Sequence, residues 1–234
     1  MSRARRLVAE GVGTGLLVAA IVGSGIMAER LAGGNVALAL LANTLSTSAT
    51  LIALILAFGP VSGAHFNPAV SLAGAWLGGL RWRDAAEYVA AQIVGALGGT
   101  FLAHAMFEQD LFQLSTRVRA GGSQMLSEYV ATFGLLSVIW GCARKHTGAV
   151  PFAVGLYIAG AYWFTASTSF ANPAVTIGRI FTDTFAGIRA VDAPGFIGAQ
   201  LLGAATASVL FRWLLRDLPA GAPDVVIPRA AATR

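Results

Sequence analysis

The chain alternates long apolar stretches with short polar connections. Six stretches have about the 20 residues that a helix needs to cross the hydrocarbon core of a bilayer. This pattern of apolar and polar positions predicts six membrane-spanning helices. We place them at residues 7–28, 35–58, 85–107, 124–143, 149–168 and 194–215.

Two shorter apolar segments, 67–78 and 172–183, are about half as long as a span. Ten helical residues rise only ~15 Å, so neither segment can cross a bilayer. Each begins near Asn-Pro, which suits a helix start because Asn caps free N–H groups and Pro fits the first turn. We therefore expect two half-helices that begin inside the membrane.

The two halves of the chain repeat the same order of features. Asn-Pro-Ala-Val occurs at 67–70 and again at 172–175. Each half holds three spans, an odd number, so the second half must enter the membrane from the opposite face, as in an inverted repeat. We expect a single domain at residues 1–218, with repeats at 5–107 and 124–216. A disordered cytoplasmic tail is expected at 219–234.

Composition agrees with a membrane protein. Hydrophobic residues make up 56% of the chain and charged residues 12%, whereas soluble proteins have about a quarter charged. The net charge of +5 would suggest a nucleic-acid partner in a soluble protein, but here arginines in the connecting loops explain it. The side richer in Arg and Lys is assigned to the cytoplasm, which places both termini inside and the chain in the inner cell membrane.

The sequence shows no grouping of residues that is typical of covalent catalysis or metal binding. The chain has one cysteine, Cys142, so it cannot build a disulfide framework. Its three histidines are dispersed, and no nucleophile–base pair stands out. We expect no cofactor, no metal site and no nucleic-acid partner.

Two half-helices that enter from opposite faces would meet near the midplane with their positive dipole ends facing each other. Asn67 and Asn172 lie at this meeting point, where their amide groups can donate hydrogen bonds to a solute. The electrostatic field there repels cations and favours neutral molecules with lone-pair oxygens. The pair therefore predicts a pore for small uncharged solutes.

These features resemble the aquaporin and aquaglyceroporin family, the major intrinsic proteins, over about residues 5–216. The resemblance rests on the inverted repeat and on the two motifs Asn67-Pro68-Ala69 and Asn172-Pro173-Ala174. It also rests on two residue pairs that recur in the two halves, Glu10 with Glu128 and Gln92 with Gln200. It implies an all-α membrane fold with six transmembrane helices and two re-entrant half-helices. It also implies a pore in every subunit, a homotetramer in membrane lipid, and no enzymatic activity. Half-helix dipoles or an arginine are the known means of ion exclusion in such pores.

The resemblance further implies a four-residue selectivity filter on the outer side of the Asn pair. Counting from the two motifs by the family's offsets assigns Thr47, Gly160, Ser169 and Val175 to it. Most members have arginine where this chain has Val175, and valine removes a cation with five N–H donors. Because the other three residues are also small, we expect a wide and neutral filter.

Valine at this position resembles a bacterial aquaporin subgroup that is associated with arsenic resistance. That resemblance implies passage of neutral arsenite and, by extension, of methylated arsenicals, with glycerol and water as further solutes. Two alternatives stay open. One is a general water and glycerol facilitator, and the other is an ion-coupled secondary transporter that uses Glu10 or Glu128.

Intramembrane polar residues have both a structural and a functional interpretation. Glu10 and Glu128 are expected to accept N–H groups of the half-helix in their own repeats rather than to relay protons, although such acids often mark function. Gln92 and Gln200 are expected to form hydrogen bonds between helices.

Two further residues are assigned to the mouths of the pore. His65 is expected near the inner mouth, with a structural role. Arg179 follows Val175 by one helical turn, so it either replaces the missing arginine as a vestibule charge or forms an ion pair with Asp183.

Overall fold

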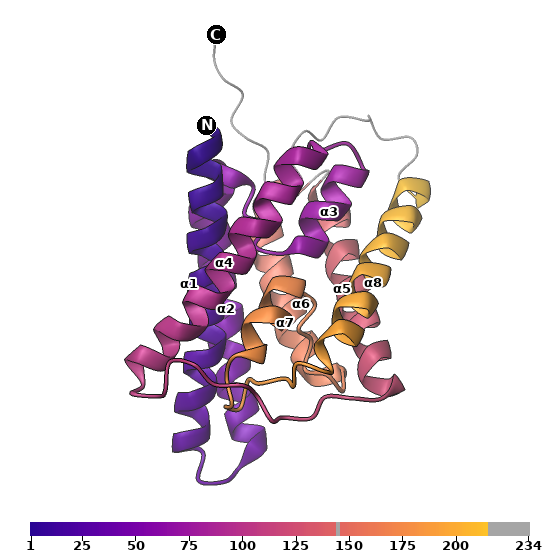
Figure 1. Cartoon of the computed structure of the whole chain (residues 1–234). Helices are drawn as coiled ribbons and strands as arrows, with labels where there is room; N and C mark the ends of the chain where they lie inside the picture. Colours follow the sequence, from indigo (N-terminus) through magenta and orange to yellow (C-terminus); the bar gives the residue numbers. More distant parts are fainter. Residues whose placement is uncertain (144–145, 215–234) are drawn as a thin grey trace.

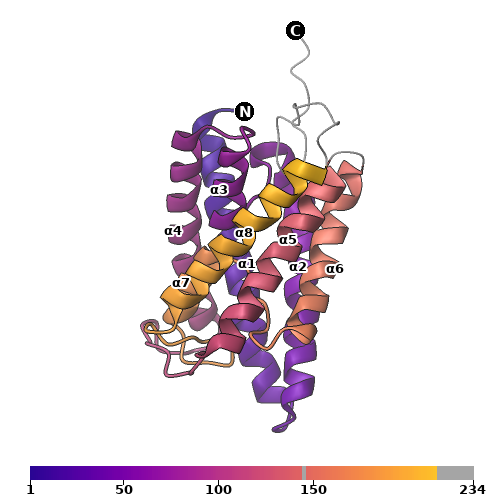
Figure 2. The ribbon, with the colours of Figure 1, turned by 90° about the vertical axis from the view of Figure 1, so that its right-hand side faces the viewer.

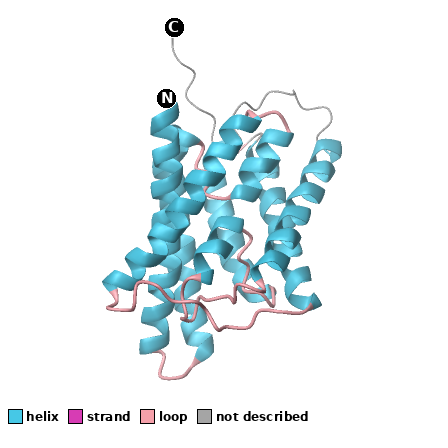
Figure 3. Ribbon diagram, viewed as in Figure 1, coloured by secondary structure: helices cyan, strands magenta, loops and turns pink. Residues whose placement is uncertain are grey.

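The computed structural model describes residues 1–143 and 146–214, and its regular structure there is helical (Figure 3). Six helical segments are long and apolar enough to cross a membrane. They are α1 (Arg3–Leu31), α2 (Val36–Ser62), α4 (Trp82–Met106), α5 (Gly122–Ala143), α6 (Val150–Phe164, after the 3-10 turn Thr147–Ala149) and α8 (Ala193–Leu214). The two short helices are α3 (Pro68–Trp76) and α7 (Pro173–Ile180). The predicted fold class is confirmed, and the predicted tail at 219–234 lies outside the described residues.

The fifth span ends four residues before its predicted bound. The apolar pattern predicts 149–168, but α6 ends at Phe164. Thr165 is extended, and Thr168 and Ser169 have positive φ angles of 62° and 50°. The chain leaves the helix there because it must turn into the loop that precedes Asn172.

Within each repeat the first and last long helices pack together: α1 lies along α4, and α5 lies along α8 (Figure 2). At the α1–α4 crossing the two backbones are in direct contact. A Cβ atom added to Gly95 would lie 2.1 Å from the carbonyl oxygen of Gly11, and one on Gly99 would lie 2.1 Å from that of Gly15. Small residues at such crossings let membrane helices approach closely.

The half-helices α3 and α7 lie in opposite halves of the bundle, and their N-terminal ends face each other (Figure 1). Each starts as the sequence predicts, with an extended Asn as cap and Pro in the first turn. The Oδ1 atom of Asn67 accepts the N–H of Ala69 at 2.9 Å, and that of Asn172 accepts the N–H of Ala174 at 3.0 Å. The start of α1 and the end of α8 lie on the same side of the molecule (Figure 1), as an even number of spans requires.

The contact between α1 and α4 generates a stability prediction. Gly95→Ala should lower the melting temperature in detergent, because its methyl group would collide with the backbone of Gly11. Gly98→Ala is the matched control: it lies on the same helix with nothing within 4 Å of the new Cβ. It should be neutral or stabilising by up to ~1 kcal/mol, the helix-propensity gain of alanine over glycine. Equal melting temperatures for the two variants would contradict this account of the crossing.

Candidate functional site

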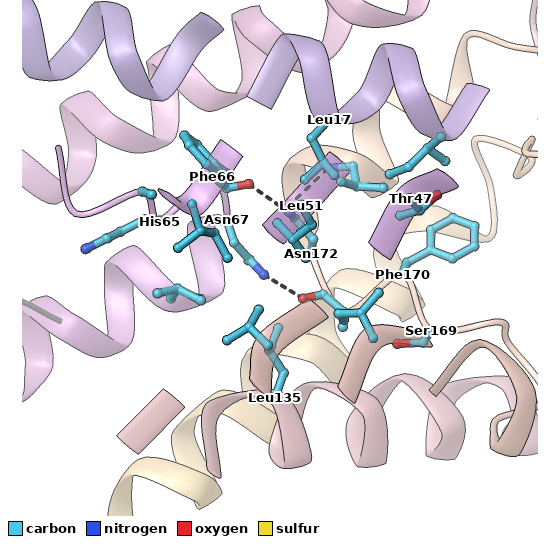
Figure 4. Close-up of a pocket in the computed structure, with 18 of the residues that line it drawn as sticks. Leu17, Thr47, Leu51, His65, Phe66, Asn67, Leu135, Ser169, Phe170 and Asn172 are labelled. Carbon is cyan, nitrogen blue, oxygen red and sulfur yellow. Dashed lines mark hydrogen bonds between the residues drawn. The ribbon is translucent and has the colours of Figure 1, made fainter. Parts of the chain in front are cut away.

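The two Asn side chains join the half-helices across the middle of the bundle. The Nδ2 of Asn67 donates to the carbonyl oxygen of Ala171 at 2.7 Å, and the Nδ2 of Asn172 donates to that of Phe66 at 2.8 Å (Figure 4). Both Asn residues are buried. Each amide nitrogen carries two N–H groups, so one remains available after the bond to the opposite loop.

Two buried carboxylates hold the loops that precede the Asn residues. Glu10 accepts the backbone N–H of His65 at 3.0 Å and that of Phe66 at 2.7 Å. Glu128 accepts the N–H of Phe170 and that of Ala171, both at 2.8 Å. These donors belong to the loop before each half-helix and not to its first turn, which the Asn residues cap.

The glutamines complete the same arrangement in both repeats. The Nε2 of Gln92 donates to Glu10 at 2.8 Å and to the Ser71 hydroxyl at 2.9 Å. The Nε2 of Gln200 donates to Glu128 at 2.6 Å and to the Thr176 hydroxyl at 2.9 Å. Each glutamine therefore ties a long helix to both the glutamate and the half-helix of its own repeat.

The loop backbones adopt left-handed conformations that need this support. Ala64 and Phe66 have φ angles of 48°, and their counterparts Ser169 and Ala171 have φ angles of 50° and 47°. Such angles in non-glycine residues cost of order 1–3 kcal/mol each. Left-handed residues that alternate with other residues along the loop turn successive backbone N–H groups toward one anion, as in a backbone nest. The carbonyl oxygens of Phe66 and Ala171 instead accept the amides of Asn172 and Asn67.

A cavity of ≈60 Å³ passes through this region and reaches both sides of the Asn pair. This volume is large enough for a few water molecules, since each needs roughly 10–15 Å³. Among the described residues that line it, none is Asp or Glu. The lining includes both Asn residues, His65 at one end, and Thr47, Ser169, Val175 and Arg179. Figure 4 shows His65 on one side of the Asn pair and Thr47 and Ser169 on the other.

Gly160 does not lie where the family offset places it. It is exposed on the outer face of α6, no other atom lies within 4 Å of the position that a Cβ atom would take there, and it is not part of the cavity lining. The cavity side of α6 instead presents Val154, Ile158 and Tyr162, spaced four residues apart. Gly160 lies two residues from both Ile158 and Tyr162, and two residues turn through about 200° on a helix of 3.6 residues per turn. Gly160 therefore lies on the opposite face of α6. Counting back from Asn172 therefore reached the wrong face.

Tyr162 is a polar lining residue that the motif spacing does not predict. Its side chain is buried, and its hydroxyl donates to the Thr47 hydroxyl at 3.3 Å. The periodicity of α6 could have identified it, because Val154, Ile158 and Tyr162 share one helix face. The tyrosine ring lies in the cavity wall, where Gly160 was expected to leave space, so this part of the wall is not composed only of small residues.

Arg179 lines the cavity and is buried at 2% exposure. The alternative of an ion pair with Asp183 is wrong: Asp183 instead accepts the backbone N–H of Thr116 at 2.8 Å and its hydroxyl at 2.9 Å. Arg179 donates from Nε to the carbonyl oxygen of Ala186, and its Cζ lies 3.3 Å from the ring centroid of Phe170.

His65, at the opposite end of the cavity, is fixed by its neighbours. Its Nδ1 lies 3.0 Å from the Ser71 hydroxyl, and its ring meets that of Tyr88 edge-on at 5.3 Å. It is therefore both a lining residue and a packed one.

The carboxylate contacts generate a prediction that separates structure from ion coupling. Glu10→Gln should lower the melting temperature strongly, because a glutamine amide would face the buried N–H groups of His65 and Phe66. Each unsatisfied buried donor costs about 1–3 kcal/mol. Glu29→Gln, at an exposed position on the same helix, is the control and should leave the melting temperature unchanged. A stable Glu10→Gln protein that lost only uphill transport would support a coupled transporter instead.

The chain is similar to known membrane channels over most of its length. Residues 1–159 match the Major intrinsic protein family. The Aquaglyceroporin AqpS of Rhizobium meliloti (strain 1021) is 59% identical over 212 residues, which cover 91% of each chain. The Probable aquaporin AqpM of Archaeoglobus fulgidus is 28% identical over 244 residues, or 93% of this chain and 99% of that one.

A solved structure supports the fold. The aquaglyceroporin from Plasmodium falciparum superposes with a TM-score of 0.69 at 22% identity, over 93% of this chain and 97% of that one. Family membership follows from the sequence matches, and the multi-pass fold follows from the helices. The chain belongs to the major intrinsic protein family, whose members are passive membrane channels and not enzymes.

Proposed function

We propose that this channel conducts small uncharged solutes that carry hydroxyl groups, with arsenite as the principal candidate. The observation that carries the proposal is the composition of the cavity wall. Val175 lines it, at 2% exposure, in the position where most members of the family have arginine. Beside the Asn pair the wall offers uncharged groups, Thr47, Ser169 and Val175 with the two Asn amides, while the charged Arg179 lies one helical turn further along α7. Uncharged hydroxyl and amide groups suit a neutral polyol, and arsenite at neutral pH is an uncharged molecule with three hydroxyls.

The Asn pair supports selection of neutral oxygen-bearing molecules. One N–H of Asn67 and one of Asn172 remain after their bonds to the opposite loops, and both can donate to a passing oxygen. The positive N-terminal ends of α3 and α7 meet at the same place, each equivalent to roughly half an elementary charge. A cation meets repulsion there and finds no carboxylate among the described lining residues.

A general water and glycerol facilitator is the second candidate, and Tyr162 favours it. Its ring adds an apolar surface beside the Thr47 hydroxyl, which fits the carbon backbone of glycerol as well as its oxygens. The relative from Rhizobium meliloti carries the name aquaglyceroporin. Methylated arsenicals, which add apolar methyl groups to the same oxygen chemistry, would contact this wall in the same way.

The membrane setting proposed for the channel is a homotetramer in the inner cell membrane with both termini in the cytoplasm. Large apolar side chains on the outer faces of the long helices support lipid or subunit contact, for example Leu45 at 60% exposure, Val94 at 71% and Leu156 at 67%. A soluble protein would rarely expose so many apolar groups together.

Substitution at the valine tests the filter. Val175→Arg should lower arsenite and glycerol uptake into proteoliposomes at least ~tenfold, as ~1.4 kcal/mol added to the barrier would do, because the long side chain would fill the cavity. Val191→Arg, at an exposed loop position (75% exposure), is the control and should conduct normally. Unchanged arsenite uptake in the Val175→Arg channel would show that Val175 is not part of the filter.

Substitution on α6 tests which face lines the pore. Tyr162→Ala should widen the constriction and raise flux of solutes larger than glycerol, measured by stopped-flow light scattering. Gly160→Trp should leave all fluxes unchanged, since the new ring would lie on the outer face of the helix. If Gly160→Trp instead blocked solute flux, Gly160 would be supported as a filter residue, as the family offset assigns it.

A further inference from the structure

Two arginines lie beside the α7 half of the cavity, defined here as the part lined by Thr47, Ser169, Val175 and Arg179. Within the described residues, Arg179 forms no ion pair within 4.0 Å. Its polar and ring contacts are one carbonyl oxygen, that of Ala186, and the ring of Phe170. A buried charge normally requires a partner of opposite charge. The guanidinium of Arg179 is thus only partly compensated.

A second guanidinium reinforces the positive potential there. The Cζ of Arg119 lies 4.9 Å from the centroid of the same Phe170 ring. Its N–H groups donate to the carbonyl oxygens of Gly187 at 2.8 Å and Ser167 at 3.0 Å. Burial, and secondly the charge of Arg117, lower the pKa of Arg119 to about 10. Arg119 therefore stays charged at neutral pH.

Ser169 supplies an independent sign of a missing ligand. Its hydroxyl is buried, lies in the cavity wall, and has no hydrogen-bond partner within the described part of the chain. A buried hydroxyl without a hydrogen-bond partner is unfavourable, so a ligand that accepts its proton would stabilise this position. Figure 4 places Ser169 beyond Asn172 as seen from His65, in the α7 half of the cavity.

We propose that Arg179 and Ser169 form a binding station for a small planar oxyanion of the monocarboxylate type. The two terminal nitrogens of a guanidinium form a fork that matches a carboxylate in a bidentate manner, and the Ser169 hydroxyl donates a third hydrogen bond. Among the described lining residues there is no carboxylate to repel the anion. Glu128, a buried acid of this repeat, is occupied by backbone N–H groups and Gln200.

Occupancy of this station has a consequence for transport, and that consequence rests on the proposed function. The station lies within the path that a neutral solute would take past Val175. A bound monocarboxylate would fill that path, so the anion would inhibit the flux of neutral solutes. Inhibition should depend on the size of the anion, because a bulky carboxylate cannot reach a buried guanidinium.

The first experiment measures glycerol flux into proteoliposomes with sodium formate on both sides, against sodium gluconate at the same concentration. Formate should lower the flux about tenfold when it is ten times above its Kd, since occupancy follows mass action. Gluconate has the same charge but is too large to reach Arg179, so it should not lower the flux. Arg179→Gln should weaken formate inhibition at least ~tenfold, as loss of hydrogen bonds to a charged group predicts. Ser169→Ala should weaken it severalfold.

Arg189→Gln is the matched control, because Arg189 lies in a nearby loop and pairs with Asp192 at 2.9 Å. It should keep full formate inhibition. If Arg179→Gln does not fold, Arg179→Lys keeps the charge without the fork and should bind formate more weakly than the native channel. Formate inhibition that is absent in the native channel, or equal in the native and Arg179 variants, would overturn the station.

Saturation-transfer NMR on the formate proton, with the full chain in detergent, makes the test independent of flux. A signal from the native protein that weakens in Arg179→Gln and persists in Arg189→Gln supports the station even if no neutral solute is conducted. That combination would refute the proposed function alone. Flux of neutral solutes without an Arg179-dependent formate signal would instead refute the station alone.

Discussion

The structure depends on the bonds between two buried glutamates and the loops that precede the half-helices. A helix that begins in the middle of a bilayer leaves N–H groups without water to satisfy them. Asn67 and Asn172 satisfy those of the first turn, but the loop residues before them also need acceptors. Glu10 and Glu128 provide these acceptors from α1 and α5. Without these acceptors, nothing would offset the energetic cost of the left-handed loop conformations.

This constraint explains why the repeat is so regular at its centre. A carboxylate, a glutamine, a hydroxyl and an Asn that caps the half-helix recur in each half, with matching partners. Each half alone would leave its Asn amide without the carbonyl of the opposite loop. The two halves therefore stabilise each other at the same point where solutes pass, and geometry that holds the fold also shapes the pore.

Most of the fold was predictable from apolar length and from the Asn-Pro starts, because both report local physical requirements. The filter was less predictable. Gly160 was assigned by counting along the chain, which assumes a constant length between α6 and Asn172. Helix phase, visible in Val154, Ile158 and Tyr162, was the better guide. The Arg179–Asp183 pair failed for another reason: Asp183 is bound by Thr116 from a distant loop, and helical spacing carries no information about such contacts.

The position of Arg179 follows from the electrostatics of α7 itself. Position 175 lies in the first turn of this helix and position 179 in its last. The N-terminal end of a helix is positive and disfavours a cation, whereas the C-terminal end stabilises one by typically 0.3–1 kcal/mol or more when partly buried. Valine in the first turn leaves the positive end facing the Asn pair undisturbed. Arginine in the last turn adds a full charge where the helix dipole supports it. On the proposed solute path, this arrangement would place a cationic group in the last turn of α7 and leave its first turn, beside Asn172, without one. A single short helix would then provide both the uncharged constriction and the positive approach that the proposed function requires.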